Sequence, residues 1–251
     1  MDKKIKITNI VLLIAGEGKR ISKFSKDPKC LLMVNKISIL ERNLNIWYKL
    51  GFKKIIVVLG YKYQSIEKIL KKFETKLRIN RVYNNKFKNF GSCYSLYLAM
   101  KKCNSNVIFF DGDVVYDAKI LKEYIRSNKE NSILVGKGSL YNTECAKIVA
   151  KKDLITRIIE KRRIKRNELI NQKFIGEMIG IGKISKNRIK SYIKIFKNNI
   201  KDKNSLLNWD TGFDKFIIKT FKTNFYYTKN NNWVEIDLLS DLRVANRIKF
   251  D

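Results

Sequence analysis

Short apolar runs alternate with amphipathic stretches along the first half of the chain. The runs are brief and mostly unbroken, which is typical of buried parallel strands. They predict strands at Asn9–Ala15, Lys54–Leu59, Leu77–Tyr83 and Val107–Asp111. The stretches between them place apolar residues at helical spacing and predict helices at Ser38–Leu50, Gln64–Phe73 and Tyr94–Lys102. Alternation of this kind indicates an α/β fold with a mostly parallel sheet and right-handed crossovers.

The second half of the chain has a different pattern, because several β-like runs follow one another. They predict strands at Ser132–Val135, Ala146–Val149, Leu154–Ile159, Met178–Ile184 and Asn224–Thr228. Helices are expected at Lys186–Lys197, Trp209–Phe221 and Asp241–Ile248, the last capped by Ser240. No linker rich in proline, glycine or serine separates the halves. We therefore expect one domain over residues 1–251, with a Rossmann-like part at 1–117 and a smaller β-rich part at 118–251.

Candidate ligand-binding residues follow the first predicted strand. In open α/β sheets, ligands bind at the carboxyl ends of the strands, and Gly16, Gly60 and Asp111 lie at such ends. The first strand is followed by Gly16-Glu17-Gly18-Lys19-Arg20, and Lys29 comes after the only proline of the chain. Backbone amides of a glycine turn, together with these cations, suit a polyphosphate anion. The region therefore predicts a nucleoside triphosphate site, although a glycine turn alone is more often only a tight connection.

The glycine turn fits neither of the two common phosphate loops. Gly18-Lys19-Arg20 lacks the Ser or Thr that ends a Walker loop, and Ile21 stands where the dinucleotide pattern has its third glycine.

Composition narrows the chemistry further. The chain has no histidine, and its four cysteines lack CxxC spacing, which excludes a histidine-ligated zinc site and any Ser-His or Cys-His dyad. A metal would be held by oxygens, so Mg²⁺ is the expected ion. The net charge of +31 comes from lysines spread over nearly every segment, so we expect no nucleic-acid partner. Without a long apolar run or a signal peptide, the protein is expected to be cytoplasmic and to have no membrane partner.

Two acidic segments supply the candidate metal ligands. Asp111-Gly112-Asp113 ends an apolar strand, which places two carboxylates at the edge where ligands bind. In Trp233-Val234-Glu235-Ile236-Asp237, alternation in an extended segment places Glu235 and Asp237 on one face. If Asp113 and Asp237 share one ion, their carboxylates should lie within about 5 Å of each other. The alternatives are an ordinary loop at Asp111–Asp113 and an exposed strand edge with ordinary acids at Glu235 and Asp237.

These motifs together resemble the nucleotidyltransferases that make nucleotide-activated sugars and alcohols. The resemblance rests on GxGxR followed by PKxLL at Gly16–Leu32, VxxGY at Val57–Tyr61, NFGSCYSL at Asn89–Leu96, DGD at Asp111–Asp113, GExxGI at Gly176–Ile181 and WxEIDxxxDL at Trp233–Leu242. The ordered set covers nearly the whole chain. Within the family, the forms look nearest to the phosphocholine and 2-aminoethylphosphonate cytidylyltransferases. Where the sugar-1-phosphate enzymes have GGxGTRL, this chain has Ala15 and Lys19, which favours the cytidylyltransferases.

The resemblance implies that CMP is transferred from CTP to a small phosphorylated alcohol, amine-bearing phosphate or phosphonate, with release of pyrophosphate and with Mg²⁺ as cofactor. The implied catalytic residues are Lys29, Arg20 and Asp113. The implied nucleotide-binding residues are Ile14, Ala15, Gly16, Glu17, Gly18, Lys19, Arg20, Lys29, Gly60, Gly91, Ser92 and Asp111. The implied metal ligands are Asp113, Glu235 and Asp237. For the acceptor we expect Glu177, Trp209 and Asp210, because an aromatic face beside an acid suits an ammonium group.

Two other functions stay open on the sequence. One is a sugar-1-phosphate nucleotidylyltransferase, which would use the same motifs with another base. The other is a catalytically inactive protein that binds through its basic surface, although Lys29, Asp113 and Asp237 are all present. A homodimer is also left open.

Overall fold

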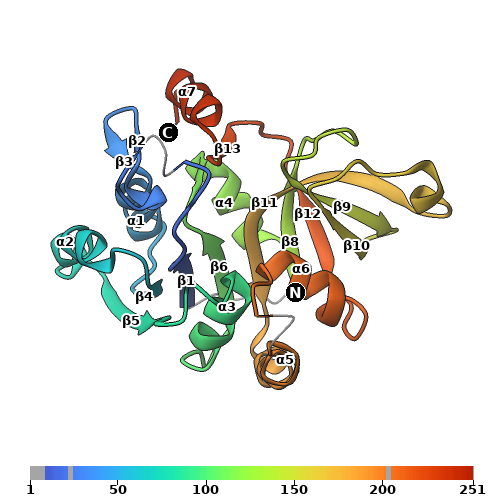
Figure 1. Cartoon of the computed structure of the whole chain (residues 1–251), viewed down its shortest axis with the longest axis horizontal. Helices are drawn as coiled ribbons and strands as arrows, with labels where there is room; N and C mark the ends of the chain where they lie inside the picture. The colour runs from blue at the N-terminus through green and yellow to red at the C-terminus, as the bar shows by residue number, and fades with distance from the viewer. Residues whose placement is uncertain (1–8, 22–24, 202–204, 251) are drawn as a thin grey trace.

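A mixed sheet runs across the molecule, from β5 at the left of Figure 1 to β9 and β10 at the right. The computed structural model describes residues 9–21, 25–201 and 205–250, and within them nine strands form this sheet in the order β5-β4-β1-β6-β11-β8-β12-β10-β9. In that order the strands span Arg78–Tyr83, Lys54–Leu59, Asn9–Ile14, Val107–Asp111, Lys173–Ile184, Ser132–Gly136, Asn224–Tyr227, Leu154–Glu160 and Ala146–Lys151.

The pairing of the strands changes halfway across the sheet. Strands β5, β4, β1 and β6 pair in parallel, as the βαβ alternation predicts. Beyond β6, β11 is antiparallel to β6, β8 and β9, and β10 is antiparallel to β9 and β12, whereas β12 is parallel to β8. The α/β class is confirmed. Parallel pairing dominates the Rossmann-like half, and the β-rich half is mostly antiparallel.

Helices cover both faces of the sheet, because alternate residues of each buried strand point to opposite sides. Ile10 and Leu12 of β1 share one core with α1 (Ile39–Lys49), α2 (Tyr63–Phe73) and α4 (Ala118–Arg126). Val11 and Leu13 share the other core with α3 (Ser92–Met100), α5 (Lys186–Asn199) and α6 (Trp209–Gly212). Within the described ranges, no helix is both long and apolar enough to cross a membrane.

Three expected elements differ from the structure. Strand β11 begins at Lys173 rather than Met178, because it continues along β9 with a register shift between Phe174 and Gly176. The expected helix at Trp209–Phe221 is the short α6 followed by a π-helical turn at Phe213–Ile217. Ser240 does not cap the last helix: α7 spans Leu239–Arg247, and the Asp241 carboxylate accepts hydrogen bonds from the amides of Asp237 and Leu238.

Several short strands were not predicted, although the segment Trp233–Asp237 was expected to be extended. Strands β7 (Val114–Tyr116) and β13 (Trp233–Glu235) form an antiparallel pair, and β2 (Met33–Val34) pairs with β3 (Ile37–Ser38). Two or three residues are too few for a period to show in the sequence. Helix α4 was also missed, although its buried Ile120, Leu121 and Tyr124 follow helical spacing.

A buried lysine caps the C-terminal end of α4. The Lys183 side chain is 2% exposed in β11, and its ammonium donates hydrogen bonds to the carbonyls of Tyr124 and Ser127 and to the Ser127 hydroxyl. These groups belong to the last turn of α4 and its cap, where carbonyls lack helical partners. Burial lowers the pKa of Lys183 to about 8.

We expect stability to depend on pH through Lys183. The unfolded chain holds the Lys183 proton up to a pH near 10.5, whereas the folded chain releases it near 8, so the unfolded state binds more protons between these values. The unfolding free energy of the wild type relative to Lys183→Met should therefore rise from pH 7.5 to pH 10, by about 1–3 kcal/mol. Chemical denaturation of both proteins at the two pH values measures this difference. A difference that stays constant with pH would contradict the assignment.

A close backbone contact joins α3 to the segment before α6. The amide of Gly91 donates to the Ser205 carbonyl at 2.8 Å, and the amide of Cys93 donates to the Leu207 carbonyl at 3.1 Å. A Cβ at Gly91 would lie 2.3 Å from the Leu207 oxygen, which real structures do not tolerate. Glycine at position 91 is therefore needed for this contact, and the contact fixes the first turn of α3.

The substitution Gly91→Ala tests this contact. Because backbone must shift to admit the new Cβ, we expect a loss of about 1–3 kcal/mol in the free energy of unfolding. Gly16→Ala is the matched control, since a Cβ there meets nothing within 4 Å, and it should change stability by no more than about 0.5 kcal/mol. Urea denaturation of the two variants and the wild type gives both values. Equal stabilities for the two variants would count against the contact.

Candidate active site

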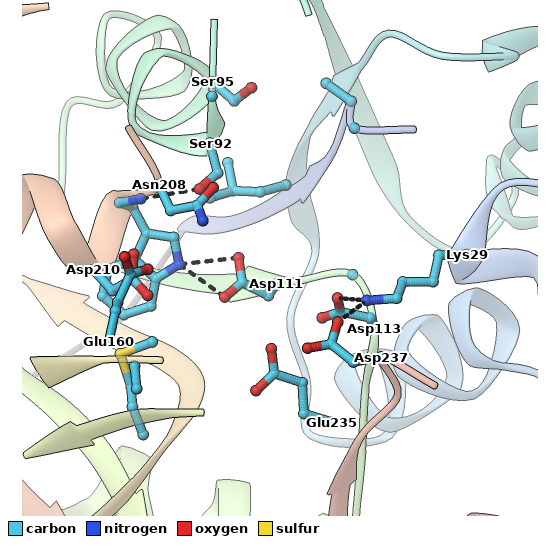
Figure 2. A pocket seen from close by; sticks show the side chains of 18 of the residues that line it. Lys29, Ser92, Ser95, Asp111, Asp113, Glu160, Asn208, Asp210, Glu235 and Asp237 are labelled. Atoms are coloured by element: carbon cyan, nitrogen blue, oxygen red, sulfur yellow. Dashed lines mark hydrogen bonds and ion pairs between the residues drawn. The ribbon is translucent and has the colours of Figure 1, made fainter. Parts of the chain in front are cut away.

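A cavity of about 280 Å³ lies at the carboxyl ends of β1 and β6. Its walls come from the loop after β1, the first turns of α3, the end of β6, the segment before α6 and the residues from β13 onward. Figure 2 shows two groups of polar side chains in it. Lys29, Asp113, Asp237 and Glu235 lie at one end, Asn208, Asp210 and Glu160 lie at the other, and Asp111 lies between them.

The two acidic segments of the sequence meet at the first end of the cavity. Strand β13 pairs with β7 so that Glu235 faces Val114, and the amide of Ile236 donates to the Asp113 carbonyl at 2.9 Å. One ligand atom from each of Asp113, Glu235 and Asp237 lies within 4.8 Å of the others. The expected closeness of Asp113 and Asp237 is therefore what the structure has.

Two cations contact these carboxylates. The Lys29 ammonium lies 2.7 Å from Asp113 Oδ2 and 2.5 Å from Asp237 Oδ1. The Arg20 guanidinium lies 2.6 Å from Asp237 Oδ2 and 3.5 Å from Glu144. Burial alone would lower the pKa of Lys29, but the charges of Asp113 and Asp237 outweigh it and raise the pKa above the ordinary value. Lys29 is therefore a cation at any physiological pH.

The donors of this cluster fit a hard divalent ion. All of them are carboxylate oxygens, which Mg²⁺ prefers. Among the described residues, Asp113 Oδ1 is one of three buried side-chain polar atoms without a hydrogen-bond partner, and a buried acceptor left without a donor is costly. Burial, followed by the charges of Asp113 and Asp237, raises the pKa of Glu235 well above its usual range. A cation at this place would oppose that rise.

Asp111 does not join the three clustered carboxylates. The indole of Trp209 donates to both of its oxygens, at 3.0 and 2.8 Å. Burial, followed by the charge of Asp113, raises the pKa of Asp111 well above its usual range. The indole therefore holds Asp111 in the middle of the cavity.

The residues expected to bind the nucleotide separate into three groups. Those lining the cavity are Ala15, Gly16, Arg20, Lys29, Gly91, Ser92 and Asp111. Ile14 and Gly18 instead line an adjoining hollow of about 110 Å³ beside Lys29. Glu17, Lys19 and Gly60 line neither space. The Lys19 side chain is 83% exposed and lies 3.7 Å from Glu17.

Gly60 has a packing role that differs from the expectation. Its Cβ position would lie 2.6 Å from the Ala15 carbonyl oxygen, and the amide of Tyr61 donates to that same oxygen at 2.9 Å. The end of β4 therefore approaches the loop after β1 directly, and Gly60 supports the loop from behind rather than facing the cavity.

Of the three expected acceptor residues, the structure brings only Trp209 and Asp210 to the cavity. The Trp209 ring is 1% exposed and packs edge to face on Phe109 and Phe213, so it offers no open aromatic face to an ammonium group. Glu177 accepts a hydrogen bond from Asn142 at 2.9 Å and lines a neighbouring pocket.

The far end of the cavity contains an acidic pair, of which the sequence analysis named Asp210 but missed Glu160. Asp210 and Glu160 share a hydrogen bond between their carboxyl groups, and Glu160 also accepts one from the Thr211 hydroxyl. Burial, the hydrogen bond and the charge of Glu160 raise the pKa of Asp210 well above its usual range. Although burial opposes it, hydrogen bonds from Asp210 and Thr211 lower the pKa of Glu160. Because two ionised carboxylates cannot donate to each other, this hydrogen bond forms only when one of the pair is protonated.

The sequence contains a pattern from which Glu160 could have been predicted as a site residue. It follows the strand predicted at Leu154–Ile159 directly, as Asp111 ends its own strand. Asn84 and Ser95 also line the cavity, but no sequence pattern identifies them. Their side chains form a buried hydrogen bond of 3.0 Å, which forms only when β5 and α3 pack together.

Comparison with known proteins agrees with this geometry. Residues 28–153, half of the chain, match the family described as "Domain of unknown function (DUF6564)". CTP:phosphoglutamine cytidylyltransferase from Campylobacter jejuni is 25% identical over 94% of this chain and 98% of its own length. Choline-phosphate cytidylyltransferase from Haemophilus influenzae is 31% identical over 45% of this chain and 46% of its own length.

Solved structures show the same fold. The inositol-1-phosphate CTP transferase from T. maritima superposes with a TM-score of 0.76, at 18% identity and with all of both chains covered. The CTP:phosphocholine cytidylyltransferase from Streptococcus pneumoniae superposes with a TM-score of 0.71, at 19% identity, covering 96% of this chain and 99% of the other. The resemblance to nucleotidyltransferases near the phosphocholine cytidylyltransferases is confirmed, and the chain belongs to the family described as a domain of unknown function, DUF6564.

Proposed function

We propose that this protein transfers CMP from CTP to a small phosphorylated acceptor and releases pyrophosphate. The observation that carries the proposal is the meeting of Lys29, Asp113 and Asp237 within one cavity, beside the glycine turn after β1. The full-length similarity to a cytidylyltransferase supports the nucleotide and the reaction type.

The reaction requires charge neutralisation and alignment more than proton transfer. A phosphate or phosphonate oxygen of the acceptor attacks the α-phosphorus of CTP, and the bond to the β-phosphate oxygen breaks, so its electrons leave with pyrophosphate. The attacking oxygen is already anionic, which removes the need for a general base. Lys29 stabilises the charge that develops on the α-phosphoryl group, and Arg20 neutralises the pyrophosphate.

The expected metal would be held by Asp113 and Asp237, with Glu235 as a third ligand. When bound, Mg²⁺ would supply positive charge at the phosphoryl oxygens. The backbone amides of Gly16 and Gly18 and the ammonium of Lys19 remain the proposed contacts to the β- and γ-phosphates.

The base is proposed to lie against the first turn of α3. Gly91 and Ser92 line the cavity there, and the Ser92 hydroxyl is oriented because it accepts a hydrogen bond from the Trp209 amide at 3.0 Å. A fixed hydroxyl and close backbone can distinguish the amino edge of cytosine from the carbonyl edge of uracil.

The acceptor is proposed to occupy the end of the cavity that holds Asp210 and Glu160. We place its phosphate near Lys29 and its remaining group toward this acidic pair; Figure 2 shows that Lys29 and the pair lie at opposite ends of the cavity. Two carboxyl groups sharing one proton favour a positively charged group on the acceptor. An amine-bearing phosphate fits this arrangement, and the phosphoglutamine named for the Campylobacter jejuni relative is one candidate.

Three expectations stay predictions: the division of the domain near residue 117, a cytoplasmic location and a homodimer.

Pyrophosphate release tests the proposed function directly. We expect turnover with CTP to exceed turnover with UTP by about tenfold or more, because uracil leaves buried hydrogen-bonding groups unpaired. The panel of acceptors should include phosphocholine, phosphoethanolamine, 2-aminoethylphosphonate, phosphoglutamine and glucose 1-phosphate. Faster release with glucose 1-phosphate than with every amine-bearing compound would instead favour the sugar-1-phosphate reaction.

Substitution of the shared carboxylates tests the catalytic cluster. Asp113→Asn and Asp237→Asn should each lower turnover by about 10²–10³, the usual cost of losing one group that stabilises the transition state. The double variant should be hardly worse than either single one, because residues that act as a unit are not additive. Asp153→Asn is the control, since that carboxylate is 76% exposed and does not line the cavity. Losses that multiply in the double variant would contradict a shared ion.

A further inference from the structure

Three of the four carboxylate oxygens of Asp113 and Asp237 contact a cation of the protein itself. Lys29 contacts Asp113 Oδ2 and Asp237 Oδ1, and Arg20 contacts Asp237 Oδ2. The fourth oxygen, Asp113 Oδ1, is buried without a hydrogen-bond partner. Both oxygens of Asp237 are contacted by a cation, so a divalent ion ligated by Asp113 and Asp237 would have to compete for at least one oxygen that Lys29 or Arg20 contacts. The nearby Lys29 ammonium would also repel the ion.

We propose that Lys29 and Arg20 act as internal counter-ions of the metal site and are transferred from the carboxylates to the phosphates of the nucleotide. Metal and nucleotide then bind with positive coupling. The nucleotide phosphates pair with the two cations, and this frees carboxylate oxygens that would ligate a metal. By linkage, the metal raises the affinity for the nucleotide by the same factor. The identity of that nucleotide rests on the proposed function.

The surroundings of Lys29 allow its side chain to move while its backbone stays in place. Lys29 begins a short 3₁₀ turn, Lys29–Leu31, which is tied by hydrogen bonds from Leu31 to the Pro28 carbonyl at 2.8 Å and from Leu32 to the Lys29 carbonyl at 3.1 Å. The hollow of about 110 Å³ beside the Lys29 stem is lined by Gly16 and Gly18 on one side and by Asp113 on the other. A four-carbon stem can therefore reach either the carboxylates or the glycine turn.

Gly18 leaves space for the Lys29 side chain to move toward the glycine turn. It has a φ of +61°, and a Cβ there would lie 3.3 Å from the Lys29 Cβ, tighter than most real contacts. The glycine turn thus lies directly against the lysine stem, and the phosphates that it would bind are within the range of the lysine.

Metal binding without nucleotide gives a direct test. Mn²⁺ is the probe, and the loss of its free electron paramagnetic resonance signal reports binding. We expect Lys29→Met to bind Mn²⁺ about tenfold or more tightly than the wild type, because the competing ammonium is gone. Lys29→Arg, which keeps the charge, should bind no more tightly than the wild type. Lys26→Met removes a charge from an exposed position of the same loop and should match the wild type. Equal Mn²⁺ affinity in Lys29→Met and Lys26→Met would overturn the proposal.

A second variant covers the case in which Lys29→Met does not fold. Arg20→Met removes the other counter-ion from a side chain that is 40% exposed, and its Mn²⁺ affinity should rise several-fold. No rise in this variant would then overturn the proposal.

The outcome also separates the counter-ion role from the proposed reaction. Tighter Mn²⁺ binding by the counter-ion variants in a protein that does not turn over CTP would uphold the counter-ion role and reject the reaction. Turnover of CTP by the wild type with unchanged Mn²⁺ affinity in the variants would reject the counter-ion role and leave the reaction standing.

Discussion

The pairing of β7 with β13 is the constraint on which the site depends. These two strands have three residues each, yet they join the segment after β6 to the segment before α7. The bond from the Ile236 amide to the Asp113 carbonyl continues the pairing by one step, so that Ile236 lies opposite Asp113 and Asp237 follows directly. Val115 and Ile236 are fully buried in one small core with Ile39 and Ala245, so packing holds the ladder from behind. A shift of one residue in the register of β13 against β7 would turn Glu235 and Asp237 away from Asp113.

Placing three carboxylates together is costly unless positive charge is near, and the fold supplies that charge from the loop after β1. Lys29 is fixed by a short turn whose Cys30 is buried, whereas Arg20 lies on a more open segment between Asp237 and Glu144. At the far end of the cavity, Asp210 and Glu160 are stabilised mainly by hydrogen bonds, and the charge of Lys161 also lowers the pKa of Glu160. One end of the cavity therefore combines two cations with three carboxylates, and the other end holds an acidic pair. This arrangement suits a molecule with a phosphate at one end and positive charge at the other.

The periodicity of apolar residues predicted the strands and helices that are largely buried. It missed the elements that form only through contacts with residues distant in sequence. Strands β4 and β6 were predicted to the residue, because their apolar runs are continuous and end abruptly. Strand β7 could not be found, since Val114–Tyr116 becomes a strand only by pairing with β13. In the site, Asp113 was recognisable from its position after a strand, Lys29 from its place after the only proline, and Asp237 from alternation in an extended segment. The packing of Trp209 against Phe109 and the partnership of Asp210 with Glu160 depend on how α6 lies on the sheet, which no local pattern encodes.

The order of strands in the sheet has a consequence for synthesis. Strand β12 fits between β8 and β10, and its residues, Asn224–Tyr227, are made after those of every other strand of the large sheet. Asp237 is made later still. A nascent chain that has already formed the parallel half around β1 still has an open seam between β8 and β10, and two of its three clustered carboxylates are missing. Catalytic competence should therefore arise late during translation, after the last strand of the sheet has been made, and contacts of such long sequence separation predict slow folding.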